Sequence, residues 1–279
     1  MTHRMEVDDL PDWTVTSIEH PVAVGRHETK VDLILLNKAL RIGVVFEFKK
    51  ARSSAYWVFF RVPHASVRRD GGVITLSHVH YQPHVSQVDW NKCLWIYDDI
   101  SLMSHLGVEV ECHKTSSSSG PSDAPSTRGT APLEDAFGQV SLGLNGLIGQ
   151  LTRERRAAEV NERVDWLFLP SVVTTASLLR CHADIRTADV LSGTISIRPQ
   201  DLATISHTVC QYPVSVSRTL DVRGSRLPKN LGAIREIELQ QSVLVIQSES
   251  FSQVMKTFPW VKLRESVDNP PTGGANPFP

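Results

Sequence analysis

The sequence lacks any apolar run of the roughly 18 to 20 residues that a membrane-spanning helix requires. It is also poor in cysteine, since its four cysteines are widely spread and form no Cys-x-x-Cys pair, which predicts neither a disulfide framework nor a zinc ribbon. The amino-terminal segment contains several acidic residues and no apolar stretch behind a basic start, so it does not have the build of a secretory signal. We therefore expect a cytoplasmic protein with reduced cysteines and no membrane association.

An excess of charge of either sign is absent as well. The formal net charge of -1 excludes the basic character of a histone-like DNA-binding protein, so any contact with nucleic acid must come from local patches. The clusters that could form such patches are Lys49, Lys50 and Arg52; Arg61, Arg68 and Arg69; and Arg153, Arg155 and Arg156. Charge runs of this kind are more often plain solvated surface.

What remains is typical of a globular protein, with 41% apolar and 21% charged residues. Runs rich in β-branched, aliphatic and aromatic residues predict strands in the first half of the chain. These strands are Val31–Leu36, Ile42–Lys49, Tyr56–Val62, Gly72–Tyr81 and Cys93–Tyr97. The third and fourth are predicted to form a hairpin around the turn Arg68–Gly72.

The second half begins after a segment rich in Ser, Thr, Pro and Gly at 115–131, which predicts a mobile loop. Apolar residues then recur at three- and four-residue steps and predict a long helix over Leu133–Glu162, with a break near Gly149 left open. Because its four glycines lower helix propensity, we expect them to allow close packing on a sheet. Later elements are predicted strands at Asp165–Thr175, Gly193–Ile197, Tyr212–Ser217 and Ser242–Gln247, and a short helix at Ser250–Phe258.

This order of elements predicts an α/β protein in which a mixed central sheet is flanked by helices. We expect one domain over residues 1–266 and a disordered tail over 267–279, where Pro and Gly are frequent.

The residues that point to chemistry lie in the predicted strand Ile42–Lys49. The two-residue period of a strand places Glu47 and Lys49 on one face, so a charged pair sits in an otherwise core-forming segment. Asp32 interrupts the preceding apolar strand in the same way. A carboxylate in such a strand is costly unless it meets a cation, a metal ion or hydrogen-bond donors.

If the two strands pair as neighbours, Asp32 and Glu47 can reach a common point. Two carboxylates beside a lysine suit Mg²⁺-assisted (or Mn²⁺-assisted) phosphodiester hydrolysis, because hard oxygen ligands hold the metal ion, which activates water and neutralises the phosphate. Lys49 would orient that water or stabilise the charge that develops on phosphorus. The spacing of the two carboxylates along the chain is 15 positions.

These residues resemble the PD-(D/E)xK, or restriction-endonuclease-like, nuclease superfamily, in which an Asp on one strand precedes a Glu-x-Lys on the next. The motif of the superfamily covers residues 15–50, and the order of elements over residues 133–175 is similar to that of its members. In this comparison residues 55–115 form an inserted or elaborated β region. It implies a metal-dependent DNA endonuclease of the type associated with prokaryotic phage and mobile-element defence. The Pro that gives the superfamily its name is replaced by Val31.

The resemblance also suggests two further site residues. Glu19 precedes the Asp strand, where many members carry an acidic residue on their first helix, and Gln139 lies early in the long helix, where some lineages place a glutamine near the metal ion or phosphate. A second Glu-x-Lys match, Glu28-Thr29-Lys30, was set aside because it lies in a polar segment with no Asp in a preceding strand.

Several alternatives stay open. The three central residues could form a structural ion pair within an inactive nuclease-fold subunit that binds or scaffolds a protein partner. His78 and His80, with His84 and Cys93, suggest a zinc site, although no set of four ligands is complete. Double-strand cutting by a protomer with one site generally takes two copies, which leads us to expect a homodimer.

Overall fold

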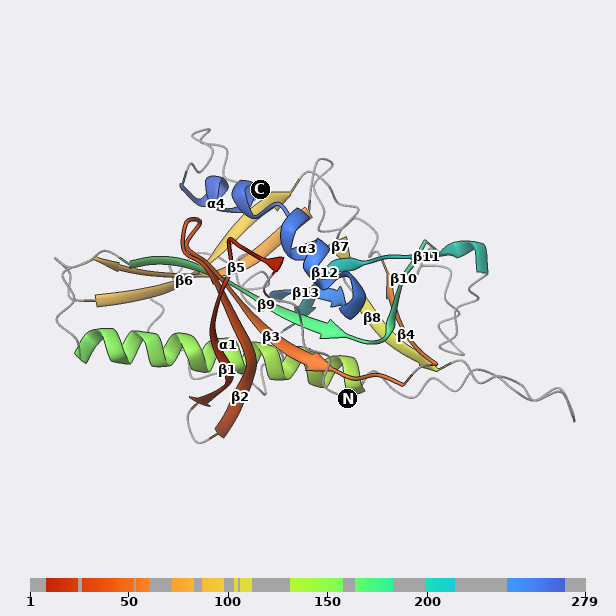
Figure 1. The fold of residues 1–279 in the computed structure, drawn as a ribbon, viewed down its shortest axis with the longest axis horizontal. Coiled ribbons are helices and arrows are strands. Elements are labelled where there is room, and N and C mark those ends of the chain that lie inside the picture. Colours follow the sequence, from red (N-terminus) through yellow and green to blue (C-terminus); the bar gives the residue numbers. More distant parts are fainter. Residues whose placement is uncertain are drawn as a thin grey trace, which may run out of the picture.

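The protein is described here by a computed structural model, which defines residues 9–24, 27–52, 54–60, 72–82, 87–97, 103–104, 106–111, 131–157, 164–182, 199–213 and 240–268. It is a mixed α/β structure with two sheets (Figure 1). In the part of the chain that is described, no helix is both long and apolar enough to cross a membrane.

The larger sheet has nine strands, in the order β1-β2-β3-β9-β13-β12-β7, with β5 paired to both β9 and β6. Their bounds are β1 Thr14–Val24, β2 His27–Asn37, β3 Ile42–Lys49, β5 Gly72–Gln82, β6 Gln87–Tyr97, β7 Met103–Ser104, β9 Val164–Thr174, β12 His207–Pro213 and β13 Gln240–Gln247. The first three strands form an antiparallel meander. β9 then joins β3 in parallel, from Ile42 beside Leu167 to Lys49 beside Thr174.

The smaller sheet has four strands in the order β11-β10-β4-β8. They are β4 Ala55–Phe60, β8 Leu106–Glu111, β10 Ser177–Cys181 and β11 Leu202–Thr204. This pairing corrects the predicted hairpin of Tyr56–Val62 with Gly72–Tyr81, because β4 pairs with β8 and β10 whereas β5 pairs with β6 and β9. β4 is buried along almost its whole length. Such a strand is stable in the interior of a sheet, here between β8 and β10, and it does not pair with β5, the next strand along the chain.

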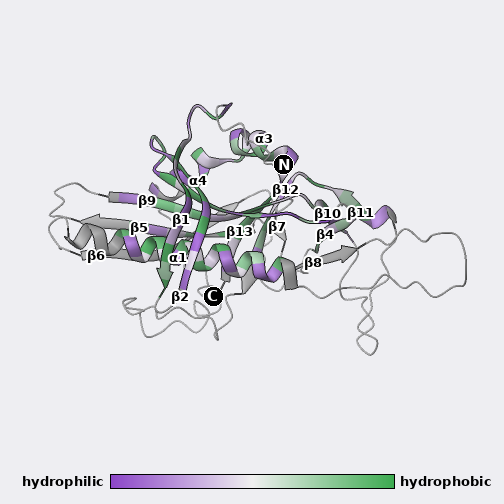
Figure 2. Cartoon of the chain, turned by 60° about the horizontal axis from the view of Figure 1, so that its bottom comes forward, coloured by the Kyte–Doolittle hydropathy of each residue, from purple (hydrophilic) through white to green (hydrophobic). Residues whose placement is uncertain are grey.

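Helices cover both faces of the larger sheet (Figure 1). α1, Ala131–Ala157, packs on one face against β1, β2, β3 and β9, and α3, Phe251–Thr257, with α4, Trp260–Asp268, contributes to the core on the other. In Figure 2 the ribbon of α1 alternates between hydrophobic and hydrophilic residues, as the three- and four-residue steps predicted. The core on the α1 side also includes Trp57 and Phe59 of the smaller sheet.

The long helix is confirmed as one continuous element over Ala131–Ala157, without a break at Gly149, and the rest of the predicted range, residues 158–162, lies outside the described residues. The predicted close packing of its glycines is confirmed at Gly143 and Gly146. A Cβ added at Gly143 would lie 2.9 Å from Val31, and one added at Gly146 would lie 2.8 Å from Val22.

Most other predicted strands are confirmed, with β3 at its predicted bounds. Six described elements were not predicted, namely β1, β7, β8, β10, β11 and α4. Of these, β1 is largely exposed and so shows no apolar alternation, and α4 follows the break at Pro259. α4 extends through Asp268, so residues 267 and 268, which were predicted to be disordered, are helical. The predicted loop 115–131, the strand Gly193–Ile197, residues 214–217 and residues 269–279 lie outside the described residues.

Gly146→Ala is expected to destabilise the fold, although alanine is the better helix former by about 1 kcal/mol. The added Cβ would meet the Cβ of Val22, and overpacking of this kind costs about 1–3 kcal/mol. Gly138→Ala is the matched control because Gly138 lies on the same helix and is only partly buried. Urea unfolding should show a loss of stability for the first variant and none for the second. Equal stability of the two variants would contradict the close packing of α1 on β1.

Candidate functional site

Asp32 lies where the pairing of β2 with β3 ends. The last paired residues are Leu33 and Phe46, and beyond them the carboxylate oxygen Oδ2 of Asp32 accepts a hydrogen bond from the backbone N–H of Phe48 at 2.8 Å. The side chain thus satisfies a backbone donor that the neighbouring strand leaves free. No hydrogen bond is formed by the second oxygen, Oδ1, within the described structure.

Glu47 and Lys49 lie at the carboxyl end of β3, level with the last residues of the parallel strand β9. The Nζ atom of Lys49 is 2.8 Å from Oε1 of Glu47, and the two side chains are 26% and 12% exposed. β3 is buried up to and including Glu47, and Phe48 and Lys49 are partly exposed, so this pair marks the point at which the strand approaches the surface.

Gln139, on the exposed part of the first half of α1, reaches the same point. Its Oε1 atom accepts a hydrogen bond from Nζ of Lys49. Lys49 therefore connects the strand that carries Glu47 with the helix that carries Gln139. The structure thus places Gln139 beside Lys49, and the role of Gln139 there stays a prediction.

Burial raises the pKa of the Glu47 carboxyl. The hydrogen bond and the charge of Lys49 act in the opposite direction, whereas the negative charge of Asp32 raises the pKa further. The two carboxylates thus lie close enough to repel each other when both are ionised, and a cation placed between them would relieve that repulsion.

Glu19 lies on β1 and not on a helix, which corrects the position expected from the resemblance. It falls between the paired residues Ile18 with Leu33 and His20 with Val31, and is therefore level with Asp32. Its backbone is in the left-handed region, with φ of 51°. Its Oε1 atom is 2.8 Å from Nζ of Lys30, and this hydrogen bond lowers the pKa of Glu19.

Lys30 is the residue near this site that sequence reasoning missed. It belongs to the Glu-x-Lys match that was set aside, yet the charges of Asp32 and Glu47 both raise its pKa, after the larger effects of Glu19. A signal was present in the sequence, because Lys30 precedes Asp32 by two residues and the two-residue period of a strand brings such residues to one side.

The site therefore consists of Lys30 and the five residues proposed from the sequence, which are Glu19, Asp32, Glu47, Lys49 and Gln139. Asp32 and Glu47 are the two that could hold a metal ion. Within the described residues no group of three or more His, Cys, Asp or Glu side chains converges. Mg²⁺ does not require such a group, since it is bound by one or two carboxylates together with water and substrate phosphate.

The zinc alternative gains no support from His78, whose Nε2 atom is 2.6 Å from Oδ1 of Asp165. The side chains of His80, His84 and Cys93 lie outside the described residues. Cys181 and Cys210 are buried and form no disulfide within the described residues, and burial raises the pKa of Cys210 to about 12.

Asp165 belongs to a second polar cluster, at the opposite end of β9. Arg264 of α4 donates to both of its oxygens, at 2.6 and 3.4 Å, and also to Asp268. Burial alone would raise the pKa of Asp165, but the hydrogen bonds of Arg264 and His78 outweigh it and hold the pKa at about 2. The cluster ties α4 to the sheet, which gives it a structural role.

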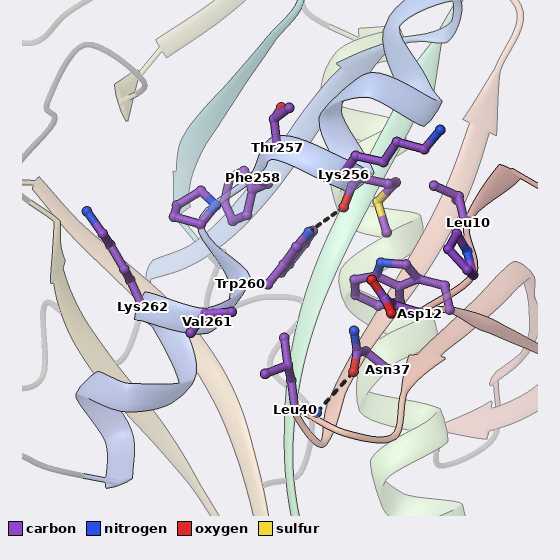
Figure 3. Close-up of a pocket in the computed structure, with 14 residues that line it drawn as sticks. Leu10, Asp12, Asn37, Leu40, Lys256, Thr257, Phe258, Trp260, Val261 and Lys262 are labelled. Atoms are coloured by element: carbon purple, nitrogen blue, oxygen red, sulfur yellow. Dashed lines mark hydrogen bonds between the residues drawn. The ribbon is translucent and has the colours of Figure 1, made fainter.

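A groove of about 500 Å³ lies at the turn between β2 and β3, at the other end of the β3 strand from Glu47 (Figure 3). Trp260 forms part of its wall, makes an edge-on contact with Trp13 with ring centroids 5.1 Å apart, and donates from Nε1 to the carbonyl of Met255 at 2.8 Å. Asn37 at its base accepts a hydrogen bond from the N–H of Leu40. None of the candidate site residues lines this groove.

The proposed basic patches are only partly described. Lys50 and Arg52 are exposed beyond the end of β3, next to the site. Arg61, Arg68 and Arg69 lie outside the described residues, as do the side chains of Arg153, Arg155 and Arg156.

Comparisons with protein-family models, with curated proteins and with solved structures found no match to this chain.

Lys49→Ala separates a functional lysine from a structural one. If Lys49 serves catalysis, its removal should leave the melting temperature nearly unchanged or raise it, because a partly exposed ion pair contributes little net stability. If Lys49 is a structural partner, Glu47 and Asp32 are left uncompensated at a cost of about 3–5 kcal/mol. We expect the first result in thermal unfolding. Strong destabilisation by Lys49→Ala that Lys49→Met rescues would assign the motif to packing.

Glu47→Gln is expected to change how stability depends on pH. Because the pKa of Glu47 is raised in the folded state, the wild-type protein should lose stability relative to this variant as pH rises above the ordinary value of 4.5, until the carboxyl is fully ionised. Melting temperatures across this range, with Glu265→Gln on the exposed side of α4 as control, measure the effect. A wild-type protein that gains stability relative to Glu47→Gln over the same range would indicate a lowered pKa instead.

Proposed function

We propose that this protein is a metal-dependent endonuclease that hydrolyses DNA phosphodiester bonds. The observation that carries the proposal is the meeting of Asp32, Glu47 and Lys49 at the end of two adjacent strands, with Gln139 of α1 on the lysine. Asp32, Glu47 and Gln139 lie apart in a sequence in which a Glu-x-Lys match is expected about once by chance, and they come from the three elements on which the resemblance depends.

The arrangement of elements supports the same reading. The antiparallel strands β2 and β3 carry the Asp and the Glu-x-Lys, and α1 lies in the connection to β9, which returns parallel to β3. We propose that β1, β2, β3, α1 and β9 form the restriction-endonuclease-like core. Strands β4 and β8 of the smaller sheet would then belong to the elaboration expected over residues 55–115, and β10 and β11 complete that sheet.

The donor set fits a magnesium or manganese ion. Asp32 and Glu47 supply hard carboxylate oxygens, and the raised pKa of Glu47 reflects a site in which additional positive charge is favourable. When bound, the ion would activate water and neutralise the phosphate. Lys49, released from Glu47, would orient the attacking water or stabilise charge on the phosphate, and Gln139 would hold the lysine in place.

The competing proposal is an inactive nuclease-fold subunit that binds a protein partner. One observation favours it, namely that Glu47, Lys49 and Gln139 already form a connected chain of polar contacts without a metal ion. Such a chain is also what a catalytic lysine needs for positioning, so metal binding and activity must decide between the two. A cytoplasmic location, a homodimer that cuts both strands and a part in defence against phage or mobile elements belong to the endonuclease proposal.

The endonuclease proposal predicts cleavage and metal binding that depend on the same residues. Plasmid DNA incubated with the protein and Mg²⁺ or Mn²⁺ should be cut, and Lys49→Ala should lower the rate by a factor on the order of 10² or more. Asp32→Ala should abolish both cleavage and the binding of Mn²⁺ measured by calorimetry, because it removes one of the two carboxylates. Asp12→Ala, at an exposed position outside the site, is the control for generic loss of charge.

Failure to cut duplex DNA, single strands and RNA with any divalent ion, combined with no Mn²⁺ binding, would favour the scaffolding subunit. Mn²⁺ binding that survives Asp32→Ala would contradict the assignment of the metal site.

A further inference from the structure

Lys30 lies beside the carboxylate of Glu19 and near those of Asp32 and Glu47. It donates a hydrogen bond of 2.8 Å to Glu19, and the charges of Asp32 and Glu47 also act on its ammonium group. Its side chain is 56% exposed and that of Glu19 is 68% exposed. An exposed ion pair contributes little net stability because water screens it, so the ammonium group can exchange one anionic partner for another at low cost.

The backbone of Glu19 gives an independent reason to assign a role to this pair. Glu19 has a φ of 51° within a strand, a conformation that residues other than Gly rarely adopt. Such strained positions persist where the surrounding structure imposes them, and they gather at functional sites. This one is level with Asp32 across the β1–β2 pair, where it places the carboxylate on Lys30.

The charges around the site lead to the same residue. Glu19, Asp32 and Glu47 with Lys30 and Lys49 carry a net charge of minus one, which attracts a divalent cation, and one such ion would reverse the sign. The site would then attract a phosphate. Lys49 is held by both Glu47 and Gln139, whereas Lys30 has one exposed partner at the edge of the site.

We infer that Lys30 binds a backbone phosphate of the DNA substrate beside the Asp32–Glu47 metal site, and that Glu19 is a positioning residue that holds Lys30 there before substrate arrives. A phosphate oxygen replaces the carboxylate of Glu19 as the acceptor of the Lys30 hydrogen bond. The contact is made to the backbone and carries no base specificity. This inference rests on the proposed function for the identity of the substrate.

The test measures binding of a fluorescein-labelled DNA duplex by fluorescence anisotropy at several salt concentrations, with Ca²⁺ in place of Mg²⁺ to prevent cleavage. Lys30→Met should weaken binding about tenfold, as for loss of one charge-assisted hydrogen bond. It should also make the dependence of log K on log salt shallower by about 0.9, the value for one lost phosphate contact on a duplex. Lys30→Arg should retain most of the affinity, and Lys38→Met, on the exposed turn after β2, is the control.

Glu19→Gln distinguishes a phosphate contact from a merely structural ion pair. Glu19→Gln breaks the pair with Lys30 but leaves the lysine in place, so duplex binding should be retained or tightened. Lys30→Met should instead weaken duplex binding. If both variants lose affinity equally, the pair acts as a structural unit and the inference is wrong. Unchanged affinity and salt dependence in Lys30→Met would also overturn it.

Failure of the proposed function would be recognised separately. Mn²⁺ binding by calorimetry should be retained in Lys30→Met, because Lys30 is not a metal ligand. A wild-type protein that binds Mn²⁺ and binds the duplex through Lys30, but does not cleave, would support the inference and refute the enzyme. A wild-type protein that does not bind the duplex would refute the inference itself.

Discussion

Burial of β3 on both faces is the constraint on which the site depends. Between Ile42 and Phe46 the strand lies in the two cores formed with α1 and with α3 and α4, where an unpaired charge would be costly. Glu47 is the first position at which a carboxylate approaches water, and it does so where β9 ends as well. The residual burial raises the pKa of Glu47 and makes a neighbouring cation favourable. In the structure Lys49 supplies this positive charge, and in the proposed enzyme a metal ion would supply part of it.

The position of Asp32 follows from the same arrangement. β2 pairs with β3 as far as Leu33 and then diverges, so a backbone donor at the end of β3 is left without a partner strand. The Asp32 carboxylate accepts it with one oxygen, and in the described structure the other oxygen forms no hydrogen bond. A structural role and the proposed metal-binding role are therefore compatible in Asp32. The hydrogen bond between Lys49 and Gln139, on the α1 side, is likewise compatible with both a structural and a catalytic role.

Burial explains which parts of the fold could be predicted from the sequence. β3 and α1 have patterns that mirror their packing, and both were predicted, with the glycines of α1 lying against Val22 and Val31. β1 escaped prediction because it is mostly exposed, and the partner of β4 escaped because strand pairing depends on distant residues, here β8 and β10. In the site, Asp32, Glu47 and Lys49 could be found because charges stand out in apolar strands. Lys30 could not, since it lies in a polar segment and its importance comes from the fold of β1 around Glu19.

The central claim is that Asp32 and Glu47 together hold one divalent metal ion, and a crystal structure with Mn²⁺, grown without sulfate, tests it most directly. The account predicts an anomalous peak at about 2.1 Å from a carboxylate oxygen of each residue, with Lys49 moved off Glu47. A structure at the same Mn²⁺ concentration with no peak between the two carboxylates, and with Lys49 still 2.8 Å from Glu47, would contradict it.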